Sequence, residues 1–192
     1  MLFRSRIDFQ HDQLTHQNQQ HYSGSETEDI TLLKKLCREG LTYRYPHPEA
    51  HVLKRIDKEI ELIIEKKFVS YFLINWDIVH YARSKNYYYV GRGSGANSIV
   101  AYLLRITDVD PIELDLYFER FINLFRQSPP DFDIDFSWRD REDITQYIFQ
   151  KFRNVTLLGA FNTFQYAATI RELGKVFGLP KHEIDEIGRA HV

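Results

Sequence analysis

The chain has one cysteine, one methionine and a formal net charge of only −2 over its 192 residues. The single cysteine, Cys37, excludes an internal disulfide framework, and its leucine neighbours predict that it lies on the apolar face of a helix. The near-neutral charge excludes a chain that is basic throughout. Any contact with a polyanion must therefore be local.

The sequence also lacks a long hydrophobic run and a signal peptide. Its longest apolar stretch, residues 68–74, is interrupted by Ser70 and is far too short to span a bilayer. The first residues alternate apolar and charged side chains, unlike a secretory leader. We therefore expect a cytoplasmic protein with no membrane partner. Hydrophobic residues make up 43% of the chain and aromatic residues 15%, which is enough for a sizeable core.

The spacing of apolar residues predicts a mostly helical chain with a few short strands. Residues 10–28 are polar and read as a linker or arm. The predicted helices cover residues 29–43, 49–67, 69–85, 98–105, 140–153 and 163–177, with further helices starting at Asp110 and after Pro180. The predicted strands cover residues 87–90, 130–136 and 155–159. The aromatic stripe of the helix over 69–85 is expected to be core.

Three aspartates alternate with apolar residues in the segment PDFDIDF, residues 130–136. In a strand, Asp131, Asp133 and Asp135 share one face, about 7 Å apart, and repel one another. A hard divalent cation that takes carboxylate oxygens would relieve this repulsion. The alternative is an edge strand charged against aggregation, but such protection usually relies on lysine. We therefore favour a metal site.

A glycine-rich turn, GRGSGAN at residues 91–97, joins a predicted strand to a predicted helix. Glycines allow close backbone approach, a helix start offers free N–H groups, and Ser94 and Arg92 add donors, so the turn suits phosphate. A tight turn that needs a positive φ is the alternative. A dinucleotide site would need an acid about 20 residues on, and Asp108 and Asp110 come early. The Gly-Lys-Ser/Thr of a P-loop is missing. A phosphate turn and an acidic strand together predict phosphoryl or nucleotidyl transfer.

These segments resemble the palm domain of the bacterial C-family DNA polymerases, the family of the catalytic alpha subunit of DNA polymerase III. The matching motifs are GRGSGANSIVAYLLRITDVDP, FERF and PPDFDIDF, flanked by LCREGL and YFLINWDIV upstream and RELGKVFG downstream. The resemblance covers residues 32–179. Each motif alone is weak, but their combination at these separations is specific.

The resemblance implies an α+β fold, a polymerase-β-like nucleotidyltransferase palm in which helices flank a small mixed sheet. The palm would cover residues 29–162, after a linker over 1–28, and residues 163–192 would begin a helical thumb. The implied activity is that of a DNA-directed DNA polymerase, which transfers a nucleotide from a dNTP to a primer 3′-hydroxyl with two Mg²⁺ ions. The implied partners are primer-template DNA, dNTP and replisome subunits such as the sliding clamp.

The resemblance also assigns site residues. Asp131 and Asp133 would be the catalytic metal ligands, with Asp135 as a weaker third. The residues expected to bind the nucleotide phosphates are Gly93, Ser94, Arg120 and Arg126. The residues expected to shape the turn are Gly91, Arg92 and Gly95. For Arg120 the alternative is a salt bridge to Asp115 or Glu119.

Two departures from the family pattern qualify this assignment. Family members commonly read Asn-Pro-Glu-Arg where this chain reads Asn-Leu-Phe-Arg at residues 123–126. The third catalytic aspartate of the family would lie beyond Val192, so we expect a fragment that is inactive alone. Three other candidates remain: an error-prone paralogue, a different nucleotidyltransferase or nuclease, and a non-catalytic palm-like interaction module. Asn97 and Pro129 resemble the residues of the error-prone branch.

Overall fold

The computed structural model describes residues 21–123, 131–159 and 165–189. The chain divides into two compact units, residues 1–155 and residues 156–192. The first unit contains α1 (Glu26–Arg44), α2 (Ala50–Glu65), α3 (Val69–Ser84), α4 (Ile99–Leu103) and α5 (Arg141–Lys151). Its strands are β1 (Tyr89–Arg92) and β2 (Asp133–Phe136), and two short 3₁₀ helices are η1 (Gly93–Asn97) and η2 (Phe118–Arg120). The second unit contains α6 (Tyr166–Val176) and α7 (Lys181–Arg189).

The first helix begins where a polar side chain can cap it. Ser25 accepts a hydrogen bond from the Glu28 backbone N–H, and acidic side chains in the first turn favour the positive end of the helix dipole. The residues just before it fold back, because the backbone N–H groups of Tyr22 and Ser23 both donate to buried Asp29 at 2.7 Å. Helix α1 therefore begins at Glu26, within the segment 10–28 expected to be a linker and before the helix predicted over 29–43.

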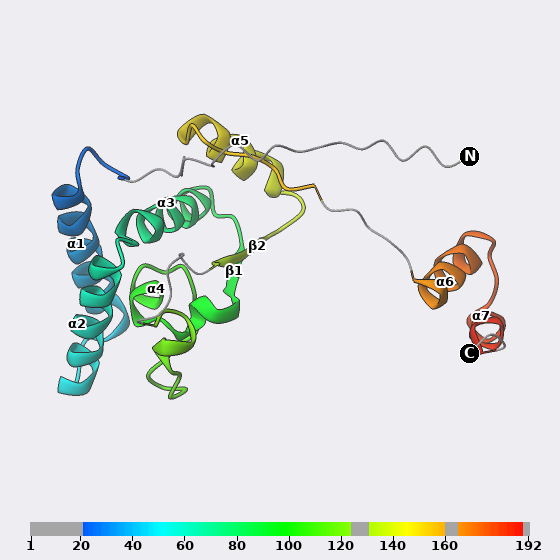
Figure 1. The fold of residues 1–192 in the computed structure, drawn as a ribbon, viewed down its shortest axis with the longest axis horizontal. Coiled ribbons are helices and arrows are strands. Elements are labelled where there is room, and N and C mark those ends of the chain that lie inside the picture. Colours follow the sequence, from blue (N-terminus) through cyan, green and yellow to red (C-terminus); the bar gives the residue numbers. More distant parts are fainter. Residues whose placement is uncertain (1–20, 124–130, 160–164, 190–192) are drawn as a thin grey trace, which may run out of the picture. The chain divides into compact units, whose positions relative to one another are not determined.

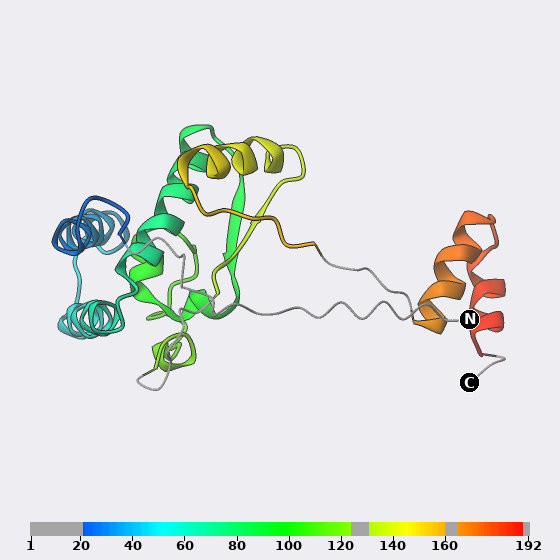
Figure 2. The same cartoon turned by 45° about the horizontal axis from the view of Figure 1, so that its top comes forward.

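The helices of the first unit enclose its core (Figures 1 and 2). Helix α3 packs against α1 and α5, and α4 packs against α1 and α2. Cys37 is buried in this core, as predicted, and burial raises the pKa of its thiol to about 12. The aromatic stripe of α3 is also core, with Phe72 fully buried and Tyr71 and Trp76 packed against the same cluster.

The two strands form an antiparallel pair in which Arg92 lies opposite Asp133 and Val90 lies opposite Asp135. Within the described residues the sheet has only these two strands. The α+β class predicted from the sequence agrees with this mixture of helices and a small sheet.

Two predicted elements are wrong. Residues 155–159 form no strand: Leu158 is 94% exposed, and the segment pairs with no described strand that could satisfy its backbone groups. Asp110 starts a turn instead of a helix. Its carboxylate accepts from the Ile112 and Glu113 N–H groups, as a cap does, but Asp115 then adopts a positive φ of 48° and stops the helical path.

The second unit is a helical pair. Helix α6 ends in a Schellman motif, in which Gly178 has a φ of +71° and the Leu179 N–H donates to the Gly174 carbonyl at 2.9 Å. Gly174 also lets α7 approach closely, because a Cβ there would lie 2.7 Å from Ile184 Cγ1. In the part of the chain that the structure describes, no helix is both long enough and apolar enough to cross a membrane.

Candidate nucleotide and metal site

The acidic strand is anchored by its apolar side. Asp131, Asp133 and Asp135 are exposed, whereas the alternating apolar residues are half-buried. The Phe132 ring stacks on Tyr71 of α3 with centroids 5.4 Å apart, and the Phe132 N–H donates to the Tyr71 hydroxyl at 2.9 Å. The aromatic stripe of α3 therefore fixes the strand so that its aspartates face outward.

The glycine turn takes a conformation that its residue types allow. Gly93 has a φ of +75°, after which residues 93–97 form η1. Gly95 is buried, and a Cβ there would lie 2.5 Å from Cδ1 of Phe132. Gly91 is more crowded still, since a Cβ there would clash with the backbone carbonyl oxygen of Ile106. The side-chain amide of Asn97 donates to the Ser94 carbonyl at 2.9 Å and closes the turn.

The turn and the acidic strand meet at Gly93 and Asp133. A Cβ at Gly93 would lie only 2.6 Å from Asp133 Oδ2. A phosphate bound by the turn would therefore lie close to the carboxylate expected to hold a metal. These residues are 40 positions apart, and their contact follows from the pairing of β1 with β2.

Arg92 supplies the positive charge beside the aspartates. Its Nε lies 2.6 Å from Asp135 Oδ2, and its Nη1 lies 3.3 Å from Asp133 Oδ2. The hydrogen bond to Asp135 and the charges of both aspartates raise the pKa of the guanidinium. All three side chains are exposed to solvent, so this pairing remains open to exchange for another cation.

The donor set suits magnesium shared with a substrate. Within residues 21–123, 131–159 and 165–189, no three Asp, Glu, His or Cys side chains are grouped so that they could hold a metal ion. Magnesium is commonly held by one or two carboxylates together with substrate phosphates. Asp131 and Asp133 are both exposed, and Asp133 lies against the turn suited to phosphate, so the pair fits this mode of coordination.

Of the two predicted phosphate-binding arginines, Arg120 lies within the described residues. Arg120 ends η2 in an exposed position and makes no ion pair with another described residue. Glu119, one of its expected alternative partners, pairs instead with Lys58 of α2 at 2.6 Å, which lowers the pKa of Glu119. Arg126 lies outside the described residues, as does Pro129.

Sequence reasoning missed a charged pair in α2. Glu59 is fully buried, and its carboxylate accepts a hydrogen bond from Arg55. Burial raises the pKa of Glu59 to about 7, while Arg55 and Ser98 act in the opposite direction. The sequence did carry a signal, because Glu59 lies one turn from both Ile56 and Ile63 on the apolar stripe.

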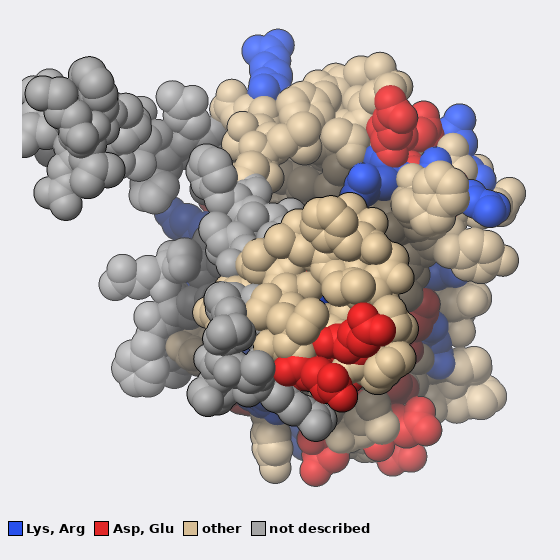
Figure 3. Space-filling model, turned by 90° about the vertical axis from the view of Figure 1, so that its right-hand side faces the viewer, with Lys and Arg blue, Asp and Glu red and all other residues tan. Residues whose placement is uncertain are grey.

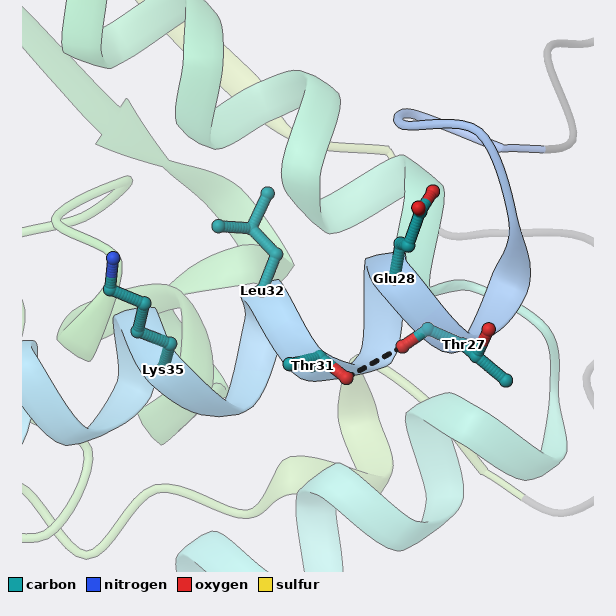
Figure 4. Close-up of a pocket in the computed structure, with 5 residues that line it drawn as sticks. All are labelled: Thr27, Glu28, Thr31, Leu32 and Lys35. Atoms are coloured by element: carbon teal, nitrogen blue, oxygen red, sulfur yellow. Dashed lines mark hydrogen bonds between the residues drawn. The ribbon is translucent and has the colours of Figure 1, made fainter.

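Elsewhere on the surface there is less to suggest a site. A pocket on α1 is lined by side chains of that helix alone, and Figure 4 shows the Thr31 hydroxyl bonded to the Thr27 carbonyl at 2.7 Å beside it. It contains none of the predicted site residues. Among the described residues visible in Figure 3, basic side chains are separated from one another by neutral and acidic ones.

The first unit is a small α+β unit that places the glycine turn, which is suited to phosphate, beside the acidic strand. Residues 31–192 match the family model described as the bacterial DNA polymerase III alpha NTPase domain. The chain therefore belongs to this family, as the resemblance indicated.

Relatives of two kinds are equally similar to the chain. It is 41% identical over 187 residues to an error-prone DNA polymerase of Saccharophagus degradans, a match that covers 95% of this chain and 18% of the relative. It is also 41% identical over 169 residues to the DNA polymerase III subunit alpha of Bacillus subtilis, covering 86% of this chain and 15% of that protein. An error-prone DNA polymerase of Anaeromyxobacter is 38% identical over 163 residues, 83% of this chain and 14% of the relative. The chain thus spans less than a fifth of these relatives' length.

Proposed function

We propose that this chain contains the palm of a DNA-directed DNA polymerase, which adds nucleotides from dNTPs to a primer 3′-hydroxyl on a DNA template. The observation that carries the proposal is the contact between the glycine turn and the acidic strand, where Gly93 and Asp133 Oδ2 leave no room for a Cβ. Family membership and the names of the relatives agree with it. The palm would have the polymerase-β-like topology and extend over residues 29–162, with the thumb beginning at 163.

In this proposal the turn binds the triphosphate of the incoming dNTP. The missing side chain at Gly93 lets phosphate oxygens approach the backbone, and the Ser94 hydroxyl adds a donor. Arg120 and Arg126 bring planar, permanently charged guanidinium groups to the same oxygens. Gly91 and Gly95 keep the turn packed against the unit, and Arg92 ties it to the acidic strand.

Asp131 and Asp133 would hold two Mg²⁺ ions, with Asp135 in a weaker supporting role. When bound, the ions would lower the pKa of the primer hydroxyl and stabilise the charge on the departing pyrophosphate. The aspartates contribute by facing outward from a strand fixed through Phe132, so that their oxygens need little rearrangement. A third ligand would come from a part of the polymerase outside this chain, and so we expect the isolated chain not to extend primers. The sliding clamp would bind elsewhere in the full-length enzyme.

Primer extension by the full-length polymerase that contains this chain tests the proposal. Asp131→Ala and Asp133→Ala should each lower the extension rate by at least about a hundredfold, because each removes a metal ligand. Glu142→Gln, which changes an exposed acid in α5, is the matched control and should extend normally. Near-normal extension by both aspartate variants would refute the metal assignment. Templated extension by the isolated 192-residue chain would refute the expected inactivity.

A second candidate is an error-prone polymerase used in repair or translesion synthesis. Asn97 is one of the two residues that resemble the error-prone branch. It is buried and closes the turn through its hydrogen bond to the Ser94 carbonyl, so it affects the shape of the proposed nucleotide site. Extension past an abasic template site separates the two roles. An error-prone enzyme should insert a nucleotide and continue, whereas a replicative enzyme should stop at the lesion.

A further inference from the structure

We infer that Arg55 and Glu59 of α2 are positioning residues that hold the two phosphate-binding segments, the glycine turn and the η2 segment, at a fixed separation. The inference rests on the proposed function, because it concerns the same triphosphate site. Neither side chain belongs to the site itself. Arg55 acts through two backbone carbonyls and Glu59 through the Ser98 hydroxyl, all in residues that lie next to the site.

Arg55 joins three segments through one guanidinium group. Its Nη2 donates to the Asn97 carbonyl at 3.1 Å and to the Leu116 carbonyl at 3.0 Å, and its Nε donates to Glu59 at 2.6 Å. Asn97 is the last residue of η1, and Leu116 shortly precedes η2. A planar fork can reach both carbonyls and the carboxylate at once, which a lysine ammonium on its flexible stem cannot do equally well.

Glu59 completes the connection from inside the core. One carboxylate oxygen accepts from Arg55, and the other accepts from the Ser98 hydroxyl at 2.8 Å. Ser98 is the N-cap of α4, and its hydroxyl oxygen also accepts from the Ala101 N–H at 3.1 Å. The buried carboxylate is thus hydrogen-bonded at both oxygens and fixes the residue at which the turn becomes a helix.

These contacts lead directly to the proposed phosphate ligands. Asn97, held by Arg55, donates its side-chain amide to the Ser94 carbonyl. On the other side, Leu116 lies four residues before Arg120 along the chain. A buried ion pair is weak evidence for stability, because apolar residues can often replace it. The Arg55–Glu59 pair contacts both segments, so we assign it a role in positioning them. Such a role matters for activity, because misplacement of a binding group by about 1 Å can cost about a hundredfold in rate.

The test compares Arg55→Lys and Glu59→Gln with Lys58→Gln in the full-length polymerase that contains this chain. Lys58 is the matched control because it lies in the same helix and reaches the same segment, but through an exposed pair with Glu119. We expect Arg55→Lys and Glu59→Gln to raise the KM for dNTP about tenfold, and Lys58→Gln to change it by less than about twofold. Mn²⁺ affinity without nucleotide should stay unchanged, because the pair touches none of the three strand aspartates.

Ser98→Ala is a milder variant for the case that the others do not fold. It keeps the Arg55–Glu59 pair but removes the hydroxyl that links Glu59 to the turn, so the KM should rise about threefold. The inference is overturned if folded variants melt at lower temperature yet keep a dNTP KM within about twofold of Lys58→Gln. It is also overturned if Mn²⁺ affinity falls in parallel with dNTP affinity, which would indicate general loss of structure.

Ser94→Ala separates this inference from the proposed function. If Ser94→Ala raises the KM for dNTP and Arg55→Lys does not, the triphosphate site stands and only the positioning role fails. If neither substitution changes the KM, the turn is not the triphosphate site, and the proposed function fails at that point.

Discussion

Two arginine–carboxylate clusters involve the glycine turn, and they differ in exposure. In the first, Arg92 contacts Asp133 and Asp135 in solvent. In the second, Arg55 contacts Glu59, whose side chain is fully buried. The exposed cluster can exchange its arginine for another cation, because water solvates whatever is released. The buried cluster cannot, because any charge left alone there is desolvated. The same arginine–carboxylate pairing therefore suits a ligand site in the exposed cluster and a rigid structural contact in the buried cluster.

The largest expected difference between the clusters is in stability. Arg55→Met leaves Glu59 buried without its cation, and we expect it to lower the free energy of unfolding by about 3–5 kcal/mol. Arg92→Met should move the urea midpoint only slightly, because its partners remain solvated. Urea unfolding followed by circular dichroism measures both. If both variants lose the same free energy of unfolding, the buried and the exposed clusters do not differ in their contribution to stability.

The pH dependence of stability sharpens the comparison. The pKa of Glu59 is raised from 4.5 to about 7 by burial, so the folded state holds its proton more tightly than the unfolded state does. The stabilisation is present below about pH 4.5 and is lost as the pH rises to about 7. We expect this to cost about 2–3 kcal/mol over that range. Glu59→Gln should flatten this part of the curve in urea titrations from pH 4.5 to 8. An unchanged slope in the variant would show that Glu59 does not titrate there.

The glycine beside the exposed cluster should be sensitive for two separable reasons. Gly93→Ala places a Cβ at a φ of +75° and 2.6 Å from Asp133 Oδ2, so we expect a loss of about 1–2 kcal/mol. Gly178→Ala is the control, because Gly178 has a φ of +71° but open space around its Cβ. Thermal melts of both variants separate backbone strain from crowding. If Gly93→Ala costs no more than Gly178→Ala, the turn and the acidic strand are not in contact.

The smallest expected effect is on metal affinity. Arg92→Gln removes the cation that competes for Asp133 and Asp135, and Mn²⁺ should then bind about threefold more tightly. Arg139→Gln, another exposed arginine, should leave the affinity unchanged. Titration followed by electron paramagnetic resonance of free Mn²⁺ reports the difference. Weaker binding in Arg92→Gln would mean that Arg92 holds the aspartates in the geometry the metal needs.

Local signals predicted much of this protein. Helical periodicity placed α2 and α3 within a few residues of their observed ends, and Cys37 was correctly expected in the core. Patterns that depend on a partner were less reliable. Residues 155–159 have strand-like composition but pair with no described strand, and Asp110 has cap chemistry without a helix to follow. In both cases the local sequence favours the element, but the described structure supplies neither a partner strand for residues 155–159 nor a helix after Asp110.

The sequence by itself determined the chemical character of the site: alternating aspartates, a glycine turn and the motifs of the polymerase III alpha family. Their separations along the chain allowed a prediction of phosphate and metal chemistry. Only the tertiary structure decided that Gly93 lies against Asp133, that Arg92 pairs with the acidic strand, and that Glu59 is buried and hydrogen-bonded to Ser98, just after the turn. Residue types reveal which interactions are possible. Which of these form depends on strand register and helix packing, because pairing β1 with β2 and packing α2 against α4 bring together residues that lie about 40 positions apart.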